Sequence, residues 1–252
     1  MDLRRLPLTA CLVAIAASSA AVAETPSYPK LPAQVLNLKA WKLTLPYNTK
    51  RRKGNPDEIV QPELAKFIDE QNFRVSPKGD SVVFRAACDG RGTENSKYPR
   101  SELREMTANG KDEASWDTND GGRHLLEAEL AVLQTPVTKE HVVCTQIHGD
   151  ADDVLMVRVE DDSLFIERHK ASDVILDSEY ELGKRFQLKI VAENGRIKAW
   201  HDGDMVMDWK KKAKDCYFKA GCYTQSSRKQ EKKDGSYGEV AVYKLKVKHS
   251  KK

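Results

Sequence analysis

Three short segments of the sequence combine side chains that bind anions with side chains that transfer protons: residues 100–104, 146–148 and 217–225. Each has the polar alternation of a β-strand, in which every second side chain points to the same side. One side of these predicted strands would therefore carry two guanidiniums, an ammonium group, a carboxamide, an imidazole and phenols. Such a surface is a poor core face and a good place to hold an anionic substrate.

The first two segments offer anion binding and proton uptake. Arg100 and Arg104 present planar donor groups that suit carboxylates, and Glu102 between them would brace the two guanidiniums. Gln146 can donate its amide N–H to an oxygen that carries partial negative charge. His148 titrates near neutrality and is therefore suited to take up a proton.

The third segment adds a second proton-transfer group. Tyr223 can donate or accept a proton if nearby cations favour its ionised form, and Lys219 would supply such a charge. Each residue also has an ordinary explanation on its own, for example His148 as a surface histidine and Tyr217 as a strand aromatic. The joint occurrence of the three segments favours a functional site.

Other kinds of site receive little support. No Ser-His-Asp order stands out, no glycine-rich phosphate loop is present, and the six histidines lack zinc-type spacing. Asp150, Asp152 and Asp153 lack the rest of a calcium loop and are better explained as a solvated turn. The basic segment 228–233 is either a mobile surface loop or a loop that hangs over the polar face and attracts a polyanion.

Eleven short alternating or apolar runs are predicted to be strands. They cover residues 41–45, 81–86, 101–106, 124–132, 142–148, 154–160, 163–168, 185–192, 196–202, 217–225 and 238–247. Turn signals separate them, and Asn194-Gly195 joins the clearest hairpin. Helical periodicity is almost absent apart from one short turn at 62–68. The pattern therefore predicts an all-β sandwich or jelly roll, and Glu105 would point into its interior.

The N-terminus has the features of an export signal. A basic start precedes an apolar stretch at 8–21, and residues 21–23 (Ala-Val-Ala) offer a cleavage site. We therefore predict a signal peptide at 1–23 and a single domain at 24–252, in a secreted or periplasmic protein. Cys11 also lies in a sequence like a lipoprotein processing box, but simple cleavage is favoured because an apolar run follows it.

Charge and cysteine content restrict the partners only weakly. The formal net charge of +4 is mildly basic, and no second long apolar run could span a membrane. Cys88, Cys144, Cys216 and Cys222 would remain after export, where disulfides can form. Cys216 and Cys222 share one predicted strand and would lie roughly 20 Å apart, which is too far for a bond between them. Pairing of either with Cys88 or Cys144 stays open.

The three polar segments resemble the signature blocks of the alginate lyases of polysaccharide lyase family 7. The blocks are residues 98–105 (YPRSELRE), 146–148 (QIH) and 217–225 (YFKAGCYTQ). The likeness extends to residues 41–46 (WKLTLP), 180–183 (YELG) and 240–247 (VAVYKLKV). It thus covers nearly all of the chain after the predicted signal peptide.

This resemblance implies a β-jelly roll sandwich of two antiparallel sheets, with a concave cleft for a polyuronate. It implies cleavage of alginate by β-elimination, without a metal or other cofactor. Arg100 and Gln146, helped by Asn95, would bind and neutralise the uronate carboxylate, because loss of the C5 proton needs a stabilised enolate-like charge. His148 would take the C5 proton, and Tyr223 would protonate the departing C4 oxygen.

The remaining polar residues of the motifs would bind substrate: Glu102, Arg104, Tyr217, Lys219 and Gln225. For the epimer that presents its proton on the other face, Tyr223 would serve as both base and acid. In this family the Ile147 form of the second motif leans towards guluronate-containing substrates. Cys144 departs from the family pattern and is predicted on the same face as Gln146, where a disulfide would constrict one end of the cleft.

Two other functions remain open at this point. A non-catalytic carbohydrate-binding module for acidic polysaccharide would need the basic residues but neither His148 nor Tyr223. A glycoside hydrolase would need two carboxylates that face each other across the cleft, and Glu102 is the only acid on the predicted polar face. We expect a monomer that acts on alginate, with no nucleic-acid or membrane partner.

Overall fold

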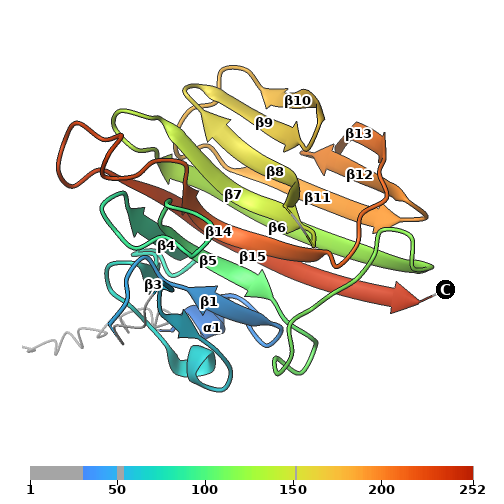
Figure 1. Ribbon diagram of the computed structural model, residues 1–252, viewed down its shortest axis with the longest axis horizontal. Coiled ribbons are helices and arrows are strands. Elements are labelled where there is room, and N and C mark those ends of the chain that lie inside the picture. Colours follow the sequence, from blue (N-terminus) through green and yellow to red (C-terminus); the bar gives the residue numbers. More distant parts are fainter. Residues whose placement is uncertain (1–30, 50–53, 151, 252) are drawn as a thin grey trace, which may run out of the picture.

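The chain folds into two antiparallel sheets packed face to face, as the strand pattern and the family resemblance predicted (Figure 1). The computed structural model describes residues 31–49, 54–150 and 152–251. The segment predicted to be a signal peptide, residues 1–23 with Cys11, lies outside this range. No helix in the described part of the chain is long and apolar enough to cross a membrane.

The first sheet has eight strands, and the three polar motifs lie side by side in its centre. In spatial order the strands are Ala171–Asp177 (β10), Ser163–Arg168 (β9), Asp153–Glu160 (β8), His141–His148 (β7), Tyr217–Thr224 (β14), Arg100–Glu105 (β5), Trp41–Thr44 (β1) and Glu58–Ile59 (β2). On one side of β14, Tyr217 lies opposite His148. On the other side, Tyr223 lies opposite Arg100. The sheet order thus joins motifs that are far apart in the sequence.

The second sheet packs against the inner face of the first. Its seven strands are, in spatial order, Asp204–Lys210 (β13), Arg196–His201 (β12), Phe186–Glu193 (β11), Gly122–Gln134 (β6), Tyr237–Lys251 (β15), Val82–Ala87 (β4) and Phe73–Val75 (β3). The described residues include one helical turn, Pro32–Val35 (α1). A 3₁₀ turn at Glu63–Lys66 occupies the place of the short helical turn predicted at 62–68.

All eleven predicted strands are present, with ends displaced by a few residues. Asn194 and Gly195 have the positive φ angles, 52° and 68°, that a type I′ hairpin needs between β11 and β12. The four strands that the sequence did not predict, β2, β3, β10 and β13, are the four edges of the two sheets. Strands β10 and β13 bury little apolar surface, so their alternation is weak, and β2 and β3 have only two and three residues, too few to show an alternation.

Alternation along β14 separates the core from the polar face. Phe218, Ala220 and Cys222 enter the core, while Tyr217, Lys219 and Tyr223 face the other way. A side chain of the size of Phe218 contributes on the order of 1.5–3 kcal/mol when it is fully buried. Gly221 has a φ of +140°, and a Cβ there would lie 2.6 Å from the carbonyl oxygen of Ser101. Glycine therefore allows β14 to pass this close to β5.

The predicted position of Cys144 on the polar face is wrong. The register of β7 against β8 is irregular between Val143 and Thr145, and one extra residue moves the following side chains to the other face. Cys144 therefore lies in the core, where its thiol donates to the carbonyl oxygen of Val157 at 3.3 Å. All four cysteines of the described residues are buried and free, so none of them forms a disulfide at the cleft.

Glu105 points inward, as predicted, and is fully buried. One of its carboxylate oxygens accepts hydrogen bonds from the Trp116 indole N–H at 3.1 Å and from the Phe218 backbone N–H at 2.9 Å. The other oxygen lies 2.5 Å from Nε2 of His249. This carboxylate thus ties β5 to β14, to β15 and to the segment that carries Trp116.

Replacement of Glu105 by Gln tests that role. An amide can accept at only one of its ends, so the hydrogen bonds from Trp116 and Phe218 and the present contact with His249 cannot all be kept, and we expect a loss of about 3 kcal/mol in the free energy of unfolding. Urea denaturation followed by tryptophan fluorescence measures it. The control Glu58→Gln removes an exposed ion-pair partner and should cost less than about 1 kcal/mol. Equal losses in the two variants would contradict the assignment.

Candidate active site

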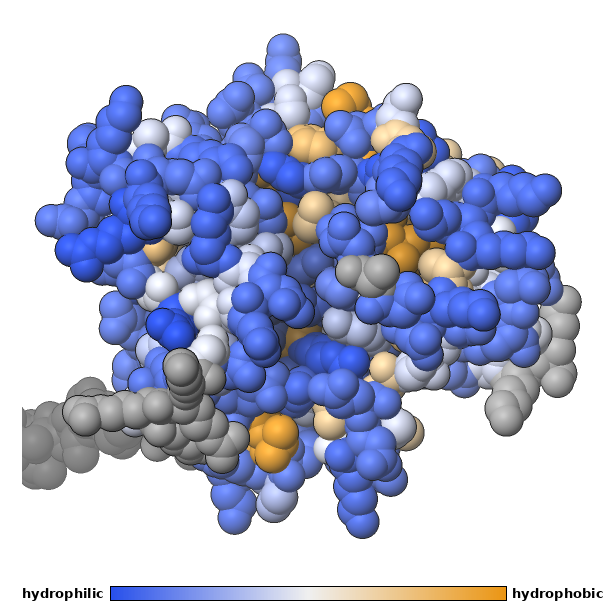
Figure 2. Space-filling view, in the orientation of Figure 1, coloured by the Kyte–Doolittle hydropathy of each residue, from blue (hydrophilic) through white to orange (hydrophobic). Residues whose placement is uncertain are grey.

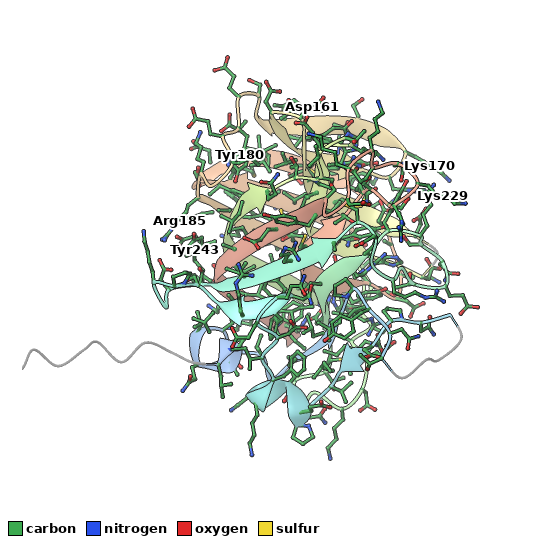
Figure 3. The ribbon with its side chains drawn as sticks, turned by 90° about the vertical axis from the view of Figure 1, so that its left-hand side faces the viewer. Asp161, Lys170, Tyr180, Arg185, Lys229 and Tyr243 are labelled. Atoms are coloured by element: carbon green, nitrogen blue, oxygen red, sulfur yellow. The ribbon has the colours of Figure 1, made fainter. Side chains whose placement is uncertain are left out.

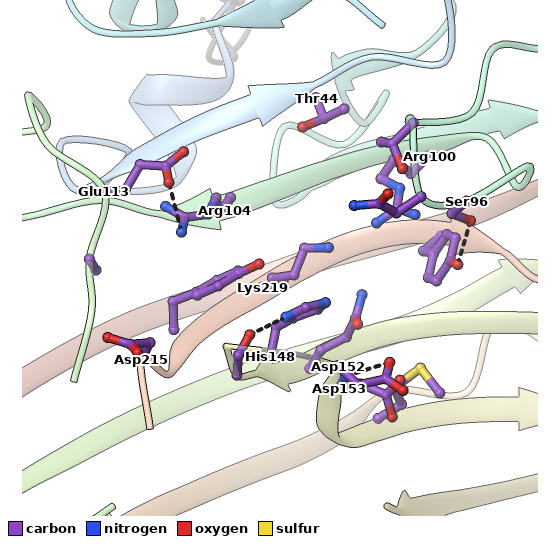
Figure 4. A pocket seen from close by; sticks show the side chains of 18 of the residues that line it. Thr44, Ser96, Arg100, Arg104, Glu113, His148, Asp152, Asp153, Asp215 and Lys219 are labelled. Carbon is purple, nitrogen blue, oxygen red and sulfur yellow. Dashed lines mark hydrogen bonds and ion pairs between the residues drawn. The ribbon is translucent and has the colours of Figure 1, made fainter. Parts of the chain in front are cut away.

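A cleft of about 900 Å³ lies on the outer face of the first sheet, with β5, β7 and β14 as its floor (Figure 4). Hydrophilic side chains dominate the surface seen in Figure 2. Nine of the ten residues predicted from the motifs line the cleft: Asn95, Arg100, Arg104, Gln146, His148, Tyr217, Lys219, Tyr223 and Gln225. The tenth, Glu102, lies beneath the floor and is only 1% exposed.

Glu102 holds together groups from all three motif strands. One of its oxygens accepts from Lys219 Nζ at 2.7 Å and lies 3.4 Å from Arg100 Nη1. The other accepts from the Gln146 amide at 2.5 Å. One carboxylate thus faces two cations, which leaves the cluster one net positive charge. Glu102 does not brace both guanidiniums as predicted, because Arg104 pairs with Glu113 at 3.0 Å instead.

The charge states of this cluster follow from its burial. Desolvation alone would raise the pKa of Glu102, but the charges of Lys219 and Arg100 outweigh it and lower that pKa. Desolvation lowers the pKa of Lys219 to about 8, although the Glu102 charge opposes the shift. Near neutral pH, Glu102 is therefore ionised and Lys219 is largely protonated.

The His148 imidazole beside this cluster is held in its neutral form. Its Nδ1 lies 2.8 Å from the carbonyl oxygen of Gly149, which can only accept, so Nδ1 carries the proton and Nε2 is free to accept one. Burial lowers the pKa of His148, and the charge of Lys219 lowers it further, against the hydrogen bond to Gly149 that raises it. The ring stacks on Tyr217 with centroids 5.2 Å apart.

Tyr223 lies among cations and a hydroxyl group. Its phenol oxygen is 2.9 Å from Ser96 Oγ, and the Arg100 guanidinium lies over its ring, 3.9 Å from the centroid. Lys219 Nζ is 6.0 Å from the same centroid. The phenol therefore has a hydrogen-bond partner and two positive charges close to it, and it faces the same cleft as His148.

The Arg104 end of the cleft contains residues that the motifs did not reveal. Arg104 lies over the Tyr217 ring, 3.8 Å from its centroid. Lys42 on β1 pairs with Glu58 and with Glu113, each at 2.8 Å. Burial raises the pKa of Tyr217 although Arg104 opposes the shift. The alternation of residues 41–44 could have indicated that Lys42 faces the cleft. The segment that carries Glu113 has no sequence pattern that would have placed it there.

An acidic group borders the cleft near His148. Asp150, Asp152 and Asp153, predicted as a solvated turn, line this edge. Burial raises the pKa of Asp153 to about 6, and Asp152 adds to the shift. Among the described residues, no group of three or more histidine, cysteine, aspartate and glutamate side chains is arranged to hold a metal ion.

Comparison with known proteins shows that this chain is similar to alginate lyases. A family profile described as alginate lyase matches residues 36–249. The chain is similar to the alginate lyase AlgAT5 from polysaccharide lyase family 7, with 45% identity and a TM-score of 0.82 over 87% of this chain and 99% of that chain. It is similar to the alginate lyase from Corynebacterium sp., with 39% identity and a TM-score of 0.82 over 88% of this chain and 99% of that chain.

A third solved structure contains a bound sugar. It is the family 7 alginate lyase A1-II′, with one histidine replaced by asparagine and one tyrosine by phenylalanine, in complex with the substrate GGMG. Identity to it is 26% and the TM-score 0.74, over 90% of this chain and 99% of that chain. No match is found among curated protein sequences.

Replacement of Glu102 by Gln tests whether this carboxylate maintains the charge of Lys219. The Glu102 charge raises the pKa of Lys219, so its removal should lower that pKa below the present value of about 8. An NMR titration of the lysine side-chain nitrogens measures it. The control Glu113→Gln removes a carboxylate from Lys42 and Arg104 and should leave the Lys219 titration in place. An unaltered Lys219 titration in Glu102→Gln would refute the assignment.

Proposed function

Because this chain belongs to the alginate lyases of polysaccharide lyase family 7, and is thus an enzyme that cleaves alginate, we propose that it does so by β-elimination in the cleft over β5, β7 and β14. The observation that carries the proposal is the convergence of four groups on one cleft: the Arg100 guanidinium, the Gln146 amide, the His148 imidazole and the Tyr223 phenol. Anion binding alone would need only the first two.

The first requirement of the reaction is neutralisation of the uronate carboxylate. The C5 proton becomes acidic only when the negative charge that spreads into the carboxylate is stabilised. Arg100 and Lys219 share one carboxylate partner, Glu102, so the cluster has one positive charge to offer. The Nε–H of Arg100 is buried without a hydrogen-bond partner in the described part of the chain. Arg100 and Gln146, with Asn95 at the rim, bind the carboxylate in this proposal.

The second requirement is a base and an acid. His148 Nε2 takes the proton from C5, and the electrons of the C5–H bond form a double bond between C4 and C5. The C4–O bond breaks, and the departing oxygen takes the proton of the Tyr223 hydroxyl group. The products are a new reducing end and a 4,5-unsaturated uronate at the new non-reducing end. The lowered pKa of His148 supports its role, because the imidazole is neutral before the reaction.

The proposal includes a preference for guluronate-containing substrate. In this family, an isoleucine at the middle position of the second motif, here Ile147 between Gln146 and His148, goes with this preference. Ile147 itself is fully buried in the core, so it would act through the position of its neighbours Gln146 and His148. Mannuronate presents its C5 proton on the other face, where Tyr223 would act as both base and acid.

We also propose that the enzyme is exported and acts as a monomer in the extracellular or periplasmic space. The export part of the proposal rests on the basic and apolar character of residues 1–23 and on the Ala-Val-Ala site before Glu24. Intact mass measurement of protein recovered from the producing cells should give a chain that begins at Glu24, and light scattering should give the mass of one chain. A full-length chain retained in the cytoplasm would overturn this part.

The reaction type is tested by following ultraviolet absorbance during incubation with alginate. Elimination leaves a double bond conjugated with the carboxylate and raises the absorbance as reducing ends appear, whereas hydrolysis produces reducing ends alone. We expect both signals to rise together, and faster on guluronate blocks than on mannuronate blocks. Reducing ends without absorbance would contradict elimination.

Two substitutions test the proton transfers. His148→Ala should lower kcat on guluronate blocks by a factor on the order of 10²–10⁴, while alginate binding is retained. Tyr223→Phe should be nearly inactive on every block type. The controls His201→Ala and Tyr243→Phe lie outside the cleft and should keep their turnover. Undiminished turnover of His148→Ala would remove His148 as the base.

A further inference from the structure

The cations along the floor of the cleft share carboxylates, but two lysines beyond its Tyr223 end do not. Arg100 and Lys219 share Glu102, and Lys42 and Arg104 share Glu113. By contrast, no carboxylate of the described residues forms an ion pair with Lys97 or Lys139. These two ammonium groups are therefore available to pair with a carboxylate from outside the protein.

Both lysines converge on the ring of Tyr98. Lys97 Nζ lies 5.2 Å and Lys139 Nζ 5.3 Å from the centroid of that ring. Partial burial raises the pKa of Tyr98, but the hydrogen bond from Gln230 and the charges of Lys139 and Lys97 outweigh it and lower the pKa overall. A half-buried aromatic ring is thus flanked by two cations. This arrangement suits an anionic sugar, whose carboxylate can pair with a lysine while its ring packs against the tyrosine.

Tyr98 is directly connected to the proposed catalytic acid. Its ring centroid is 6.4 Å from that of Tyr223. Ser96 Oγ accepts a hydrogen bond from the Tyr98 backbone N–H at 3.2 Å and lies 2.9 Å from the Tyr223 hydroxyl oxygen. Ser96, which lines the cleft, therefore contacts both tyrosines, and this places Tyr98 beside the Tyr223 end of the cleft.

Gln230 and Glu231 of the basic segment 228–233 support the Tyr98 region, and the segment does not cover the cleft. None of its residues lines the cleft, and Lys229 is exposed at the periphery of the molecule (Figure 3). Glu231 turns inward instead and accepts from the backbone N–H of Thr138 at 2.9 Å and of Lys139 at 3.2 Å. The Gln230 amide lies 3.5 Å from the Tyr98 hydroxyl oxygen. Of the two alternatives left open for this segment, a loop that hangs over the polar face is not observed, because Gln230 and Glu231 anchor the segment elsewhere.

We propose that Tyr98, Lys97 and Lys139 form an outer subsite that binds the carboxylate and ring of a uronate beyond those at the scissile bond. The inference rests on the proposed function, since it takes the ligand to be the same polyuronate. Such a contact is made equally in the ground state and the transition state, so it lowers KM without raising kcat. It acts only on chains long enough to reach Tyr98.

The double variant Lys97→Ala/Lys139→Ala tests the subsite. KM for long alginate should rise about three- to tenfold at low salt, with kcat unchanged, and the increase should shrink as salt is added. For oligomers too short to pass Tyr223, KM should stay at the wild-type value. The matched control Lys229→Ala/Lys232→Ala removes the same charge from exposed positions of the neighbouring segment and should leave KM unchanged for all chain lengths.

Three outcomes would overturn the subsite: an unchanged KM for long chains, an equal rise in the control, or an equal rise for the shortest oligomers. The last two would indicate a general effect of net charge. Titration calorimetry of alginate oligomers of increasing length into Tyr223→Phe, with and without the lysine substitutions, gives a readout without turnover. A wild-type protein that fails to produce ultraviolet absorbance would defeat the proposed reaction, whereas the length dependence of binding would still decide the subsite.

Discussion

The site depends on one buried carboxylate that faces two positively charged side chains and can balance only one of them. Glu102 pairs with Lys219 on β14 and with Arg100 on its own strand, and it accepts a hydrogen bond from Gln146 on β7. An isolated buried charge would be costly, so the three strands are constrained to keep these partners in place. Because two cations face one anion, the floor of the cleft keeps a positive charge whose natural partner is the carboxylate of a substrate.

The same positive charge lies beside both groups that transfer protons in the proposed reaction. It helps to keep His148 neutral, because Lys219 adds to the effect of burial on the imidazole, and a neutral imidazole is the form that can accept a proton. It lies close to the Tyr223 phenol, over whose ring the Arg100 guanidinium packs. In the proposed reaction, substrate binding and proton transfer thus use a single electrostatic arrangement, which would explain why the polar residues of three distant segments occur on one sheet.

Much of this arrangement could be predicted from the sequence, because alternation identifies strands whose two faces differ sharply. Such strands occupy the inner positions of both sheets, and the four edge strands were missed because they are very short or bury little apolar surface. Alternation also failed at Cys144, where an irregular register in β7 reversed the face. Contacts between distant segments have no local signature, so the pairing of Arg104 with Glu113 and of Ser96 with Tyr223 could not be anticipated.

The most direct test of the central claim is a crystal structure of Tyr223→Phe with a bound guluronate oligomer. Our account predicts that the carboxylate of one uronate lies within hydrogen-bond distance of the Arg100 guanidinium and the Gln146 amide, with its C5 facing Nε2 of His148. A sugar bound over β5, β7 and β14 whose carboxylate points away from Arg100, or whose C5 faces away from His148, would contradict it.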